Sequence, residues 1–280
     1  MESNLMDLHI HSNFSDGTST WQDILRQAEA AGLQKISITD HDNCDVYFHI
    51  TDPQKYFSGE IITGIEMQAY YRGFSIEMLG YEFDPHKMRD AIQGLYLPFS
   101  EINRHWFTRL VTIFEAIGIQ LGDTNYTNQR HYSTHFLHDE MRKIPENRKK
   151  IPDEESWQSY HIFYRRHMSN PASPFYIDES DITPSADKVM DIIRQTGGKV
   201  VLPHVFQYEE NAEMMLQGLL PFLDGIECYY PGFTSAQTSR LLELCEERGL
   251  FATGGSDYHG NTRENRIGIF PNFVAKGRQI

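Results

Sequence analysis

The sequence predicts an α/β protein built on a mainly parallel sheet or barrel that carries a helical insertion. Seven short apolar runs recur along the 280 residues, and helical patterns separate several of them. Residues 86–185 interrupt this alternation. We therefore expect a barrel domain of residues 1–85 and 186–280 and a helical insertion domain of residues 86–185. No glycine-rich phosphate loop follows any of the runs, so a nucleotide-binding Rossmann site has no support.

The apolar runs have the length and composition of buried strands. In chain order they read NLMDLHI, KISITD, EIITGIEM, SIEMLGYEF, KVVLPH, GIECYY and LFATGG.

Three of the helices expected between strands have recognisable starts. Thr20 and Asp23 have capping-box spacing before the first helix. Thr183 is a candidate cap for a second helix, with Pro184 at its first position. A third helix is expected within residues 234–249, which begin with another capping-box pair and end with glycine.

The insertion begins with an amphipathic helix, followed by a polar, aromatic and basic stretch. We expect it to pack over one end of the barrel. The apolar stripe of its first helix consists of Phe99, Ile102, Trp106, Leu110, Ile113, Phe114 and Ile117.

Composition excludes several classes of function. The formal net charge of -14 makes long nucleic acid and anionic membrane surfaces unlikely partners. The three cysteines form no CxxC pair and no disulfide framework, and no signal peptide or membrane span is visible. These features favour a reduced, cytoplasmic protein, and its 13 histidines make metal chemistry worth testing.

The first strand raises the question of metal binding directly. In an extended chain Leu8 and Ile10 point to one side, while Asp7, His9 and His11 point to the other. Two residues of strand rise separate the histidines by roughly 6.6 Å, so both imidazoles can reach one ion. The alternative is one satisfied core histidine and one surface histidine.

Polar ligand types recur near the ends of the other strands, where barrel enzymes build their sites. Their side chains are all His, Asp or Glu, which favours Zn, Mn or Fe. The candidate metal ligands are His9, His11, Asp16, His41, Glu66, Glu77, His204, Asp257 and His259.

The segments DLHIHSNFSDGT, SITDHDN, GIEM, DGIECYYPGF and ATGGSDYHG resemble the PHP (polymerase and histidinol phosphatase) family, in its branch of stand-alone metal-dependent phosphoesterases. STHFLHDEM and SPFYI resemble the helical cap of that branch. The resemblance implies a distorted seven-stranded (β/α)7 TIM-like barrel with two or three divalent metal ions at the C-terminal strand ends.

The resemblance also implies how the ligands are shared. His9, His11 and Asp257 would hold one metal, Glu66 would bridge to a second metal that His204 also binds, and Asp16, His41 and His259 would hold a third. Glu77 stands where relatives usually have His. As a ligand it would favour Mn or Fe(II) over Zn; otherwise the second site is weak or empty, or Glu77 points to solvent.

Other positions concern the substrate and the surroundings of the metals. Arg130, His131 and His135 are candidates for binding substrate phosphate, and the alternative is a solvated basic helix face. Asp40 and Asp42 are candidates for supporting the ligating histidines. Substrate specificity does not transfer directly, because Ser133 stands where relatives often have Arg, and Pro203 and Val205 also depart from the family pattern.

The function implied is a metal-dependent phosphoesterase that hydrolyses a small phosphorylated substrate, a nucleotide or another phosphomonoester, with metal-activated water. His204 and His259 are the candidate catalytic acids for the leaving group. Two alternatives are a C–N or C–O hydrolase of the amidohydrolase type and a non-enzymatic, metal-stabilised binding module.

Overall fold

The computed structural model describes residues 5–127, 132–262 and 265–268, and these form two compact units. The first unit comprises Met1–Ala69, Glu77–Gln93 and Ala186–Ile280, and the second comprises Tyr70–Ile76 and Gly94–Ser185. The second unit thus begins after residue 93 and also includes the hairpin tip at residues 70–76.

The first unit is a seven-stranded sheet in which the strands follow one another in chain order. This confirms the predicted α/β fold and all seven strands. They are β1 (Met6–Ile10), β2 (Lys35–Ile38), β3 (Glu60–Tyr71), β4 (Phe74–Tyr81), β5 (Lys199–Leu202), β6 (Gly225–Tyr229) and β7 (Phe251–Gly254).

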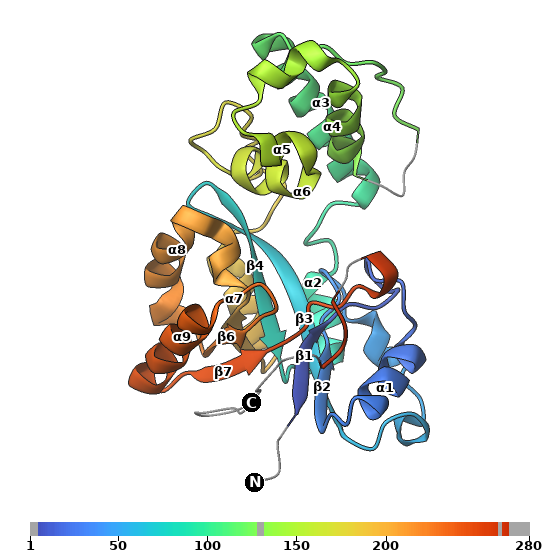
Figure 1. Ribbon diagram of the computed structural model, residues 1–280. Helices are drawn as coiled ribbons and strands as arrows, with labels where there is room; N and C mark the ends of the chain where they lie inside the picture. Colours follow the sequence, from blue (N-terminus) through green and yellow to red (C-terminus); the bar gives the residue numbers. More distant parts are fainter. Residues whose placement is uncertain (1–4, 128–131, 263–264, 269–280) are drawn as a thin grey trace. The chain divides into compact units, whose positions relative to one another are not determined.

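The sheet curves so that its first strand meets the segment after its last strand (Figure 1). The N–H of His11 donates to the carbonyl of Tyr258 at 2.8 Å, and the N–H of Asp257 donates to the carbonyl of His9 at 2.8 Å. These bonds link the residues after β7 to the end of β1, where the candidate ligands lie.

One strand departs from the parallel arrangement. β4 pairs with β5 in antiparallel register, with Leu79 opposite Val201. It follows β3 after the two-residue turn of Arg72 and Gly73, whose φ values of 51° and 93° suit a tight hairpin. The sequence signals for separate strands did not reveal this hairpin.

Among the described residues, five α-helices belong to the first unit: α1 (Trp21–Ala30), α2 (Pro85–Ile92), α7 (Ala186–Gln195), α8 (Ala212–Leu219) and α9 (Ser235–Arg248). Thr20 caps α1, and the capping box of Thr234 and Gln237 begins α9 as predicted. The prediction for α7 was wrong by two residues. The carbonyl of Pro184 accepts the N–H of Tyr70, so Thr183 and Pro184 precede the helix.

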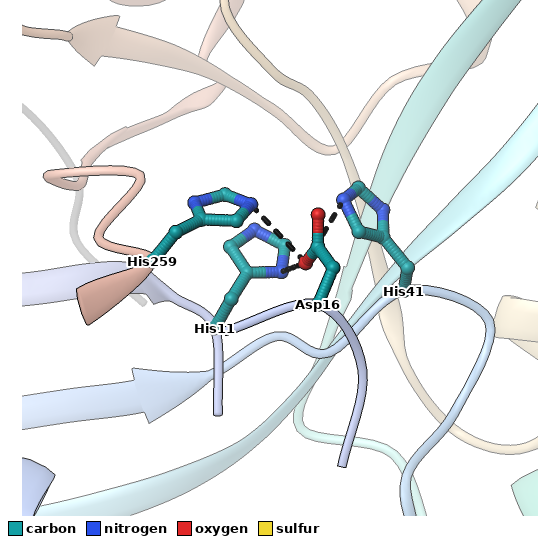
Figure 2. Close-up of side chains that lie close together, drawn as sticks. All are labelled: His11, Asp16, His41 and His259. Atoms are coloured by element: carbon teal, nitrogen blue, oxygen red, sulfur yellow. Dashed lines mark ion pairs between the residues drawn. The ribbon is translucent and has the colours of Figure 1, made fainter. Parts of the chain in front are cut away.

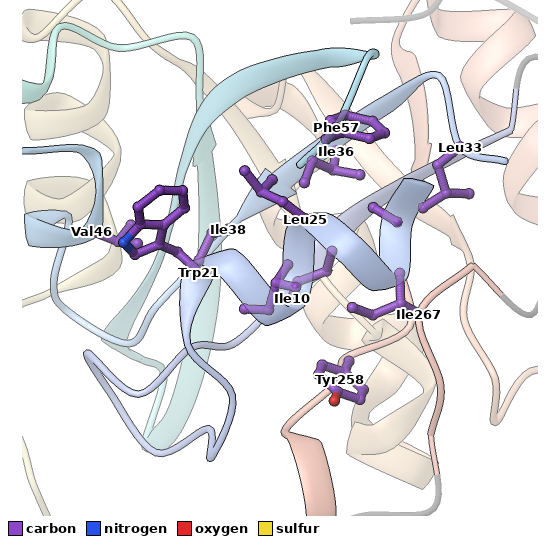
Figure 3. Packing of buried hydrophobic residues seen from close by; sticks show 12 residues of the cluster. Ile10, Trp21, Leu25, Leu33, Ile36, Ile38, Val46, Phe57, Tyr258 and Ile267 are labelled. Carbon is purple, nitrogen blue, oxygen red and sulfur yellow. The ribbon is translucent and has the colours of Figure 1, made fainter. Parts of the chain in front are cut away.

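Helix α1 packs its apolar face on the first strands (Figure 3). Ile24 and Leu25 are fully buried with Ile10, Ile36 and Ile38. Leu8 belongs to a different cluster, with Leu79 and Val201, and a register irregularity lies between Asp7 and Ile10. The expected simple alternation of β1 therefore does not place Leu8 and Ile10 in one cluster.

The second unit is helical: α3 (Phe99–Ile117), α4 (Ser133–Arg142), α5 (Glu154–Gln158), α6 (Tyr160–Phe163) and a π-helical turn (Tyr164–Met168). Its core joins Leu110 and Phe114 of α3 to Leu137, Phe163 and Phe175. Phe99, at the start of the predicted stripe, is 40% exposed. No helix formed by the described residues combines the length and apolar character needed to cross a membrane.

Candidate metal centre

All nine predicted ligands gather in the first unit. They come from β1, β3 and β4 and from the segments after β1, β2, β5 and β7. Their ligand atoms form four overlapping groups, within each of which all atoms lie within 4.8 Å of one another. The groups are His11, Asp16, His41 and His259; His9, His11 and Asp257; His9, Glu66 and His204; and His41, Glu66 and Glu77.

Glu66 lies at the centre of this arrangement and is 1% exposed. Its Oε2 is 3.2 Å from Nε2 of His9, 3.2 Å from Nε2 of His11 and 3.3 Å from Nδ1 of His41. Its Oε1 is 3.0 Å from Nε2 of His204. One carboxylate thus faces four histidines from three segments of the chain, as a bridging ligand would.

The carboxylate of Asp16 lies between three histidines, as Figure 2 shows. Its Oδ1 is 3.2 Å from Nε2 of His259, 3.7 Å from Nδ1 of His11 and 3.8 Å from Nε2 of His41. Its side chain is 41% exposed and that of His41 is 27% exposed, whereas His11 and His259 are buried. Solvent therefore reaches the cluster from the side of Asp16 and His41.

Asp257 approaches the HxH pair from the other edge of the barrel. Its Oδ1 is 3.4 Å from Nε2 of His11 and 3.7 Å from Nε2 of His9. Its Oδ2 accepts a hydrogen bond of 2.9 Å from the hydroxyl of Tyr230, to which Gln207 also donates. These bonds hold the carboxylate with one oxygen toward the histidines.

Glu77 lies in the middle of β4 and not at a strand end. β4 also runs antiparallel to β5. Oε2 of Glu77 is nevertheless 3.4 Å from Nε2 of His204, and its side chain is 23% exposed. Its backbone N–H donates to the hydroxyl of Tyr208. The side chain thus points toward the cluster.

Unusual backbone angles accompany the site. Asp42, His204 and Asp257 have φ values of 50°, 24° and 52°, in the left-handed region that residues other than glycine rarely adopt. All three lie within a few residues of a strand end. Backbone strain of this kind is concentrated at functional sites, where contacts with the surrounding structure hold the backbone in an unfavourable conformation.

Buried opposite charges shift the ionisation of the cluster. Burial lowers the pKa of His9, but Glu66 and Glu227 outweigh it and raise this pKa well above its usual range. Burial also opposes charge on His11, yet the nearby carboxylates of Asp257 and Glu66 raise its pKa to about 9. Burial raises the pKa of Glu66, but the surrounding histidines hold it well below its usual value.

The arrangement fits divalent cations. His9 Nε2, both ring nitrogens of His11 and His204 Nδ1 are buried and make no hydrogen bond to any described residue. A buried polar atom without a partner is costly, and metal binding would satisfy those that face the cluster. The donor set of imidazoles and carboxylates suits borderline or hard ions, which would displace the protons that the histidines otherwise hold.

Two carboxylates near the cluster have contacts that the sequence analysis did not predict. Among the described residues the carboxylate of Asp40 accepts hydrogen bonds from Ser12 and Ser15, so it holds the loop that carries Asp16. Sequence reasoning missed Glu227, which is fully buried and contacts His9. The signal available was a lone Glu inside the apolar run GIECYY.

One of the three predicted phosphate-binding residues, His135, is described and belongs to the second unit. His135 lies on α4 of the second unit, where its ring stacks on Tyr160 with centroids 4.6 Å apart. Its side chain is 46% exposed and lies 3.8 Å from Asp139. Arg130 and His131 lie outside the described residues. Their role in binding phosphate stays a prediction.

Comparison with known proteins decides the family. The PHP domain profile matches residues 7–163, which is more than half of the chain. The chain belongs to the PHP family. A phosphoribosyl 1,2-cyclic phosphate 1,2-diphosphodiesterase from Eggerthella lenta is 27% identical over 91% of this chain and 94% of its own length. A 3',5'-nucleoside bisphosphate phosphatase from Chromobacterium violaceum is 20% identical over 91% of this chain and 87% of its own length.

Solved PHP-like structures share the fold. A protein from Bifidobacterium adolescentis described as a metal-dependent phosphoesterase has a TM-score of 0.63 and 23% identity, covering 94% of this chain and 91% of its own. An amidohydrolase from Chromobacterium violaceum, solved with sulfate and no metal, has a TM-score of 0.68 and 19% identity, covering 97% of this chain and 93% of its own. At these identities the likeness concerns the fold alone.

Proposed function

We propose that this PHP-family chain, a metal-dependent phosphoesterase, hydrolyses a phosphate ester of a small molecule with two or three divalent ions. The observation that carries the proposal is the convergence of nine ligating side chains on overlapping groups around Glu66. The curated relatives act on phosphate esters by their names, which supports the same reaction here.

The groups suggest how the ions are shared. His9, His11 and Asp257 would hold one ion, and Glu66 would bridge to an ion also bound by His204 and Glu77. Asp16, His41 and His259 would hold a third. His11 and His41 each belong to two of the groups, through different ring nitrogens, and as a neutral ligand each would bind an ion through one of them.

When bound, divalent ions would lower the pKa of water and take up charge that develops on the phosphate oxygens. The chain would supply access and protons. Substrate would enter beside Asp16 and His41, which are the exposed members of the cluster. His259 belongs to that open group, so with two ions bound and the third position empty it, and not His204, would be the acid that protonates the leaving oxygen.

Aromatic side chains next to the cluster favour a nucleotide among phosphorylated substrates. The Tyr230 ring is 5.5 Å from that of His204, and Phe233 lies 5.3 Å from Tyr230 and 5.0 Å from Phe206. Phe206, Tyr230 and Phe233 are only half-buried. A base can stack on such a surface, with about 1–3 kcal/mol per stacked base in single-stranded nucleic acid complexes.

The direct test is phosphate release by the purified chain loaded with Mn. We expect inorganic phosphate from nucleoside monophosphates, with slower release from sugar phosphates of equal charge. Release of an amine or acid from amide or carboxyl-ester substrates, with none from a broad phosphate panel, would favour the amidohydrolase alternative. Fewer than two metals per chain and no turnover would favour a binding module.

Variants test the substrate class separately. Phe206→Ala and Phe233→Ala should raise KM for nucleotides several-fold and leave release from a sugar phosphate unchanged. Phe222→Ala, at a phenylalanine 50% exposed elsewhere on the first unit, is the matched control. Equal effects on both substrates would count against base stacking.

A further inference from the structure

We propose that Glu227 is a positioning residue that holds His9 in its metal-binding tautomer and ties it to the His204 segment. The inference rests on the metal centre of the proposed function. Glu227 lies in β6 and is fully buried, and both of its oxygens are used. It belongs to none of the four ligand groups.

The first oxygen acts on His9. Oε1 of Glu227 lies 3.0 Å from Nδ1 of His9. An ionised carboxylate only accepts hydrogen bonds, so Nδ1 carries the hydrogen. In the neutral ring the lone pair then lies on Nε2, the atom that is 3.2 Å from Glu66 Oε2 and faces the cluster. Glu227 thereby selects the tautomer that can bind a metal through Nε2.

The second oxygen acts on the backbone of His204. Oε2 of Glu227 accepts the N–H of His204 at 2.7 Å. This residue has a φ of 24°, which an L-residue adopts only when its surroundings hold it there. Its Nε2 lies 3.0 Å from Glu66 Oε1. One side chain of β6 thus positions ligands that come from β1 and from the segment after β5.

Packing alone gives no reason for a carboxylate at this position. The side chain of Glu227 is fully buried. Burying a charge is costly unless specific hydrogen bonds compensate. The two bonds to His9 and His204 are the compensation, and both serve the centre.

Glu227→Gln is the informative substitution, because it preserves size and removes one acceptor. If the amide oxygen accepts from His204, the NH2 group faces His9 Nδ1 and forces the hydrogen onto Nε2, which then cannot bind metal. If the oxygen accepts from His9, the NH2 group faces the His204 N–H and that bond is lost. Either orientation damages one ligand.

The experiment compares wild-type chain, Glu227→Gln and Glu179→Gln. Glu179 is also a buried glutamate, 3% exposed, but it lies in the second unit, outside the centre. We expect Glu227→Gln to lower affinity for Mn or Zn by about 10–100-fold in metal titration. Glu179→Gln should leave metal affinity unchanged. Equal metal affinity in wild type and Glu227→Gln would overturn the proposal.

A second measurement does not depend on turnover or on a variant that folds. Nitrogen-15 NMR of the metal-free wild-type chain, above the pKa of His9, should show His9 with its hydrogen on Nδ1. A hydrogen on Nε2 would overturn the tautomer assignment.

Glu227→Asp keeps two acceptor oxygens and should recover part of the metal affinity lost in Glu227→Gln. Metal affinity no better than in the Gln variant would contradict the positioning role.

The two proposals fail in different ways. A wild-type chain that binds metal but releases no phosphate would overturn the proposed function and leave the test of Glu227 intact. A wild-type chain that releases phosphate, with unchanged metal affinity in Glu227→Gln, would overturn the role of Glu227 alone.

Discussion

The two units of the chain arrange their buried polar side chains differently. The first unit encloses a cluster of histidines and carboxylates beside its apolar clusters. The second unit is held by an aromatic and aliphatic core around Leu110, Phe114 and Phe163. Most of the net charge of -14 also lies in the first unit, while acidic and basic residues nearly balance in the second. The comparison separates a unit built around a ligand site from a unit built by packing.

The difference has a thermodynamic consequence. Carboxylates crowded in a buried cluster repel one another unless cations neutralise them. Bound metal should therefore stabilise the first unit and contribute little to the second. The predictions below test that contrast, from the largest expected effect to the smallest.

Replacing His9 and His11 together with alanine should lower phosphate release by at least about 10³-fold, a loss of about 4 kcal/mol in transition-state stabilisation. Both residues face Glu66 and Asp257, so no ion can be held there. Metal analysis should show one ion fewer per chain, and circular dichroism should show a folded protein. Normal turnover would mean that the opening HxH is not a metal site.

Asp257→Asn should be at least as damaging as His259→Asn. Asp257 faces the HxH pair, whereas His259 belongs to the group around Asp16. We expect losses of about 10²-fold or more for Asp257→Asn. The comparison measures turnover and metal content of both variants under the same loading. An active Asp257→Asn with full metal content would refute the assignment.

Metal loading should stabilise the two units unequally. At free metal 100 times Kd, each ion adds about 2.7 kcal/mol to the unit that binds it. Hydrogen exchange should therefore slow in β1 and β5–β7 and not in α3.

Leu110→Ala should destabilise the second unit by about 2–5 kcal/mol and leave metal content unchanged. If metal slowed hydrogen exchange equally in both units, the prediction that metal stabilises mainly the first unit would be wrong.

Glu179 is a pH-sensitive buried group of the second unit that the metal does not control. Burial raises the pKa of Glu179 to about 7 from an unfolded value of 4.5. Between those values the folded state holds a proton that the unfolded state has lost, so stability is highest below pH 4.5 and falls as pH rises to 7. The loss is about 3 kcal/mol for one group.

Glu179→Gln should abolish that decline in the stability of the second unit. The stability is measured at each pH, at constant temperature, from hydrogen exchange in α3. Thr183→Val, close to Glu179 in the same unit, is a control that leaves the carboxyl in place. A decline of the same size in Glu179→Gln would assign it to another group.

Glu77→His should give the smallest effect, a change in metal preference. Removing one negative ligand favours Zn over Mn or Fe(II) and makes the bound water more acidic, so the acidic limb of the pH–rate profile should move to lower pH. Ratios of turnover with Mn and Zn measure the preference. An unchanged ratio and an unchanged profile would mean that Glu77 is not a ligand.

Local pattern was enough to predict the strands and the identities of the clustered residues. Short apolar runs mark buried strands wherever they fold, and His41, His204 and Asp257 meet because the parallel strands that precede them end at one edge. Glu66 and Glu77 lie inside β3 and β4, so the rule of strand ends did not place them. Cap residues such as Thr20 and Thr234 act within a few residues of themselves, so helix starts near them are also readable.

The rest depended on contacts between residues distant in sequence. The antiparallel direction of β4, the start of α7 after a bond to Tyr70, and the sharing of His11 between two groups all come from pairing across the fold. Glu227 shows the limit most clearly: its sequence context is an apolar strand, and only tertiary structure places its oxygens on His9 and His204, 218 and 23 residues away. The strands and the side chains of metal-ligand type were readable from the chain because those signals are local, whereas the partners of each side chain were decided by the closure of the barrel.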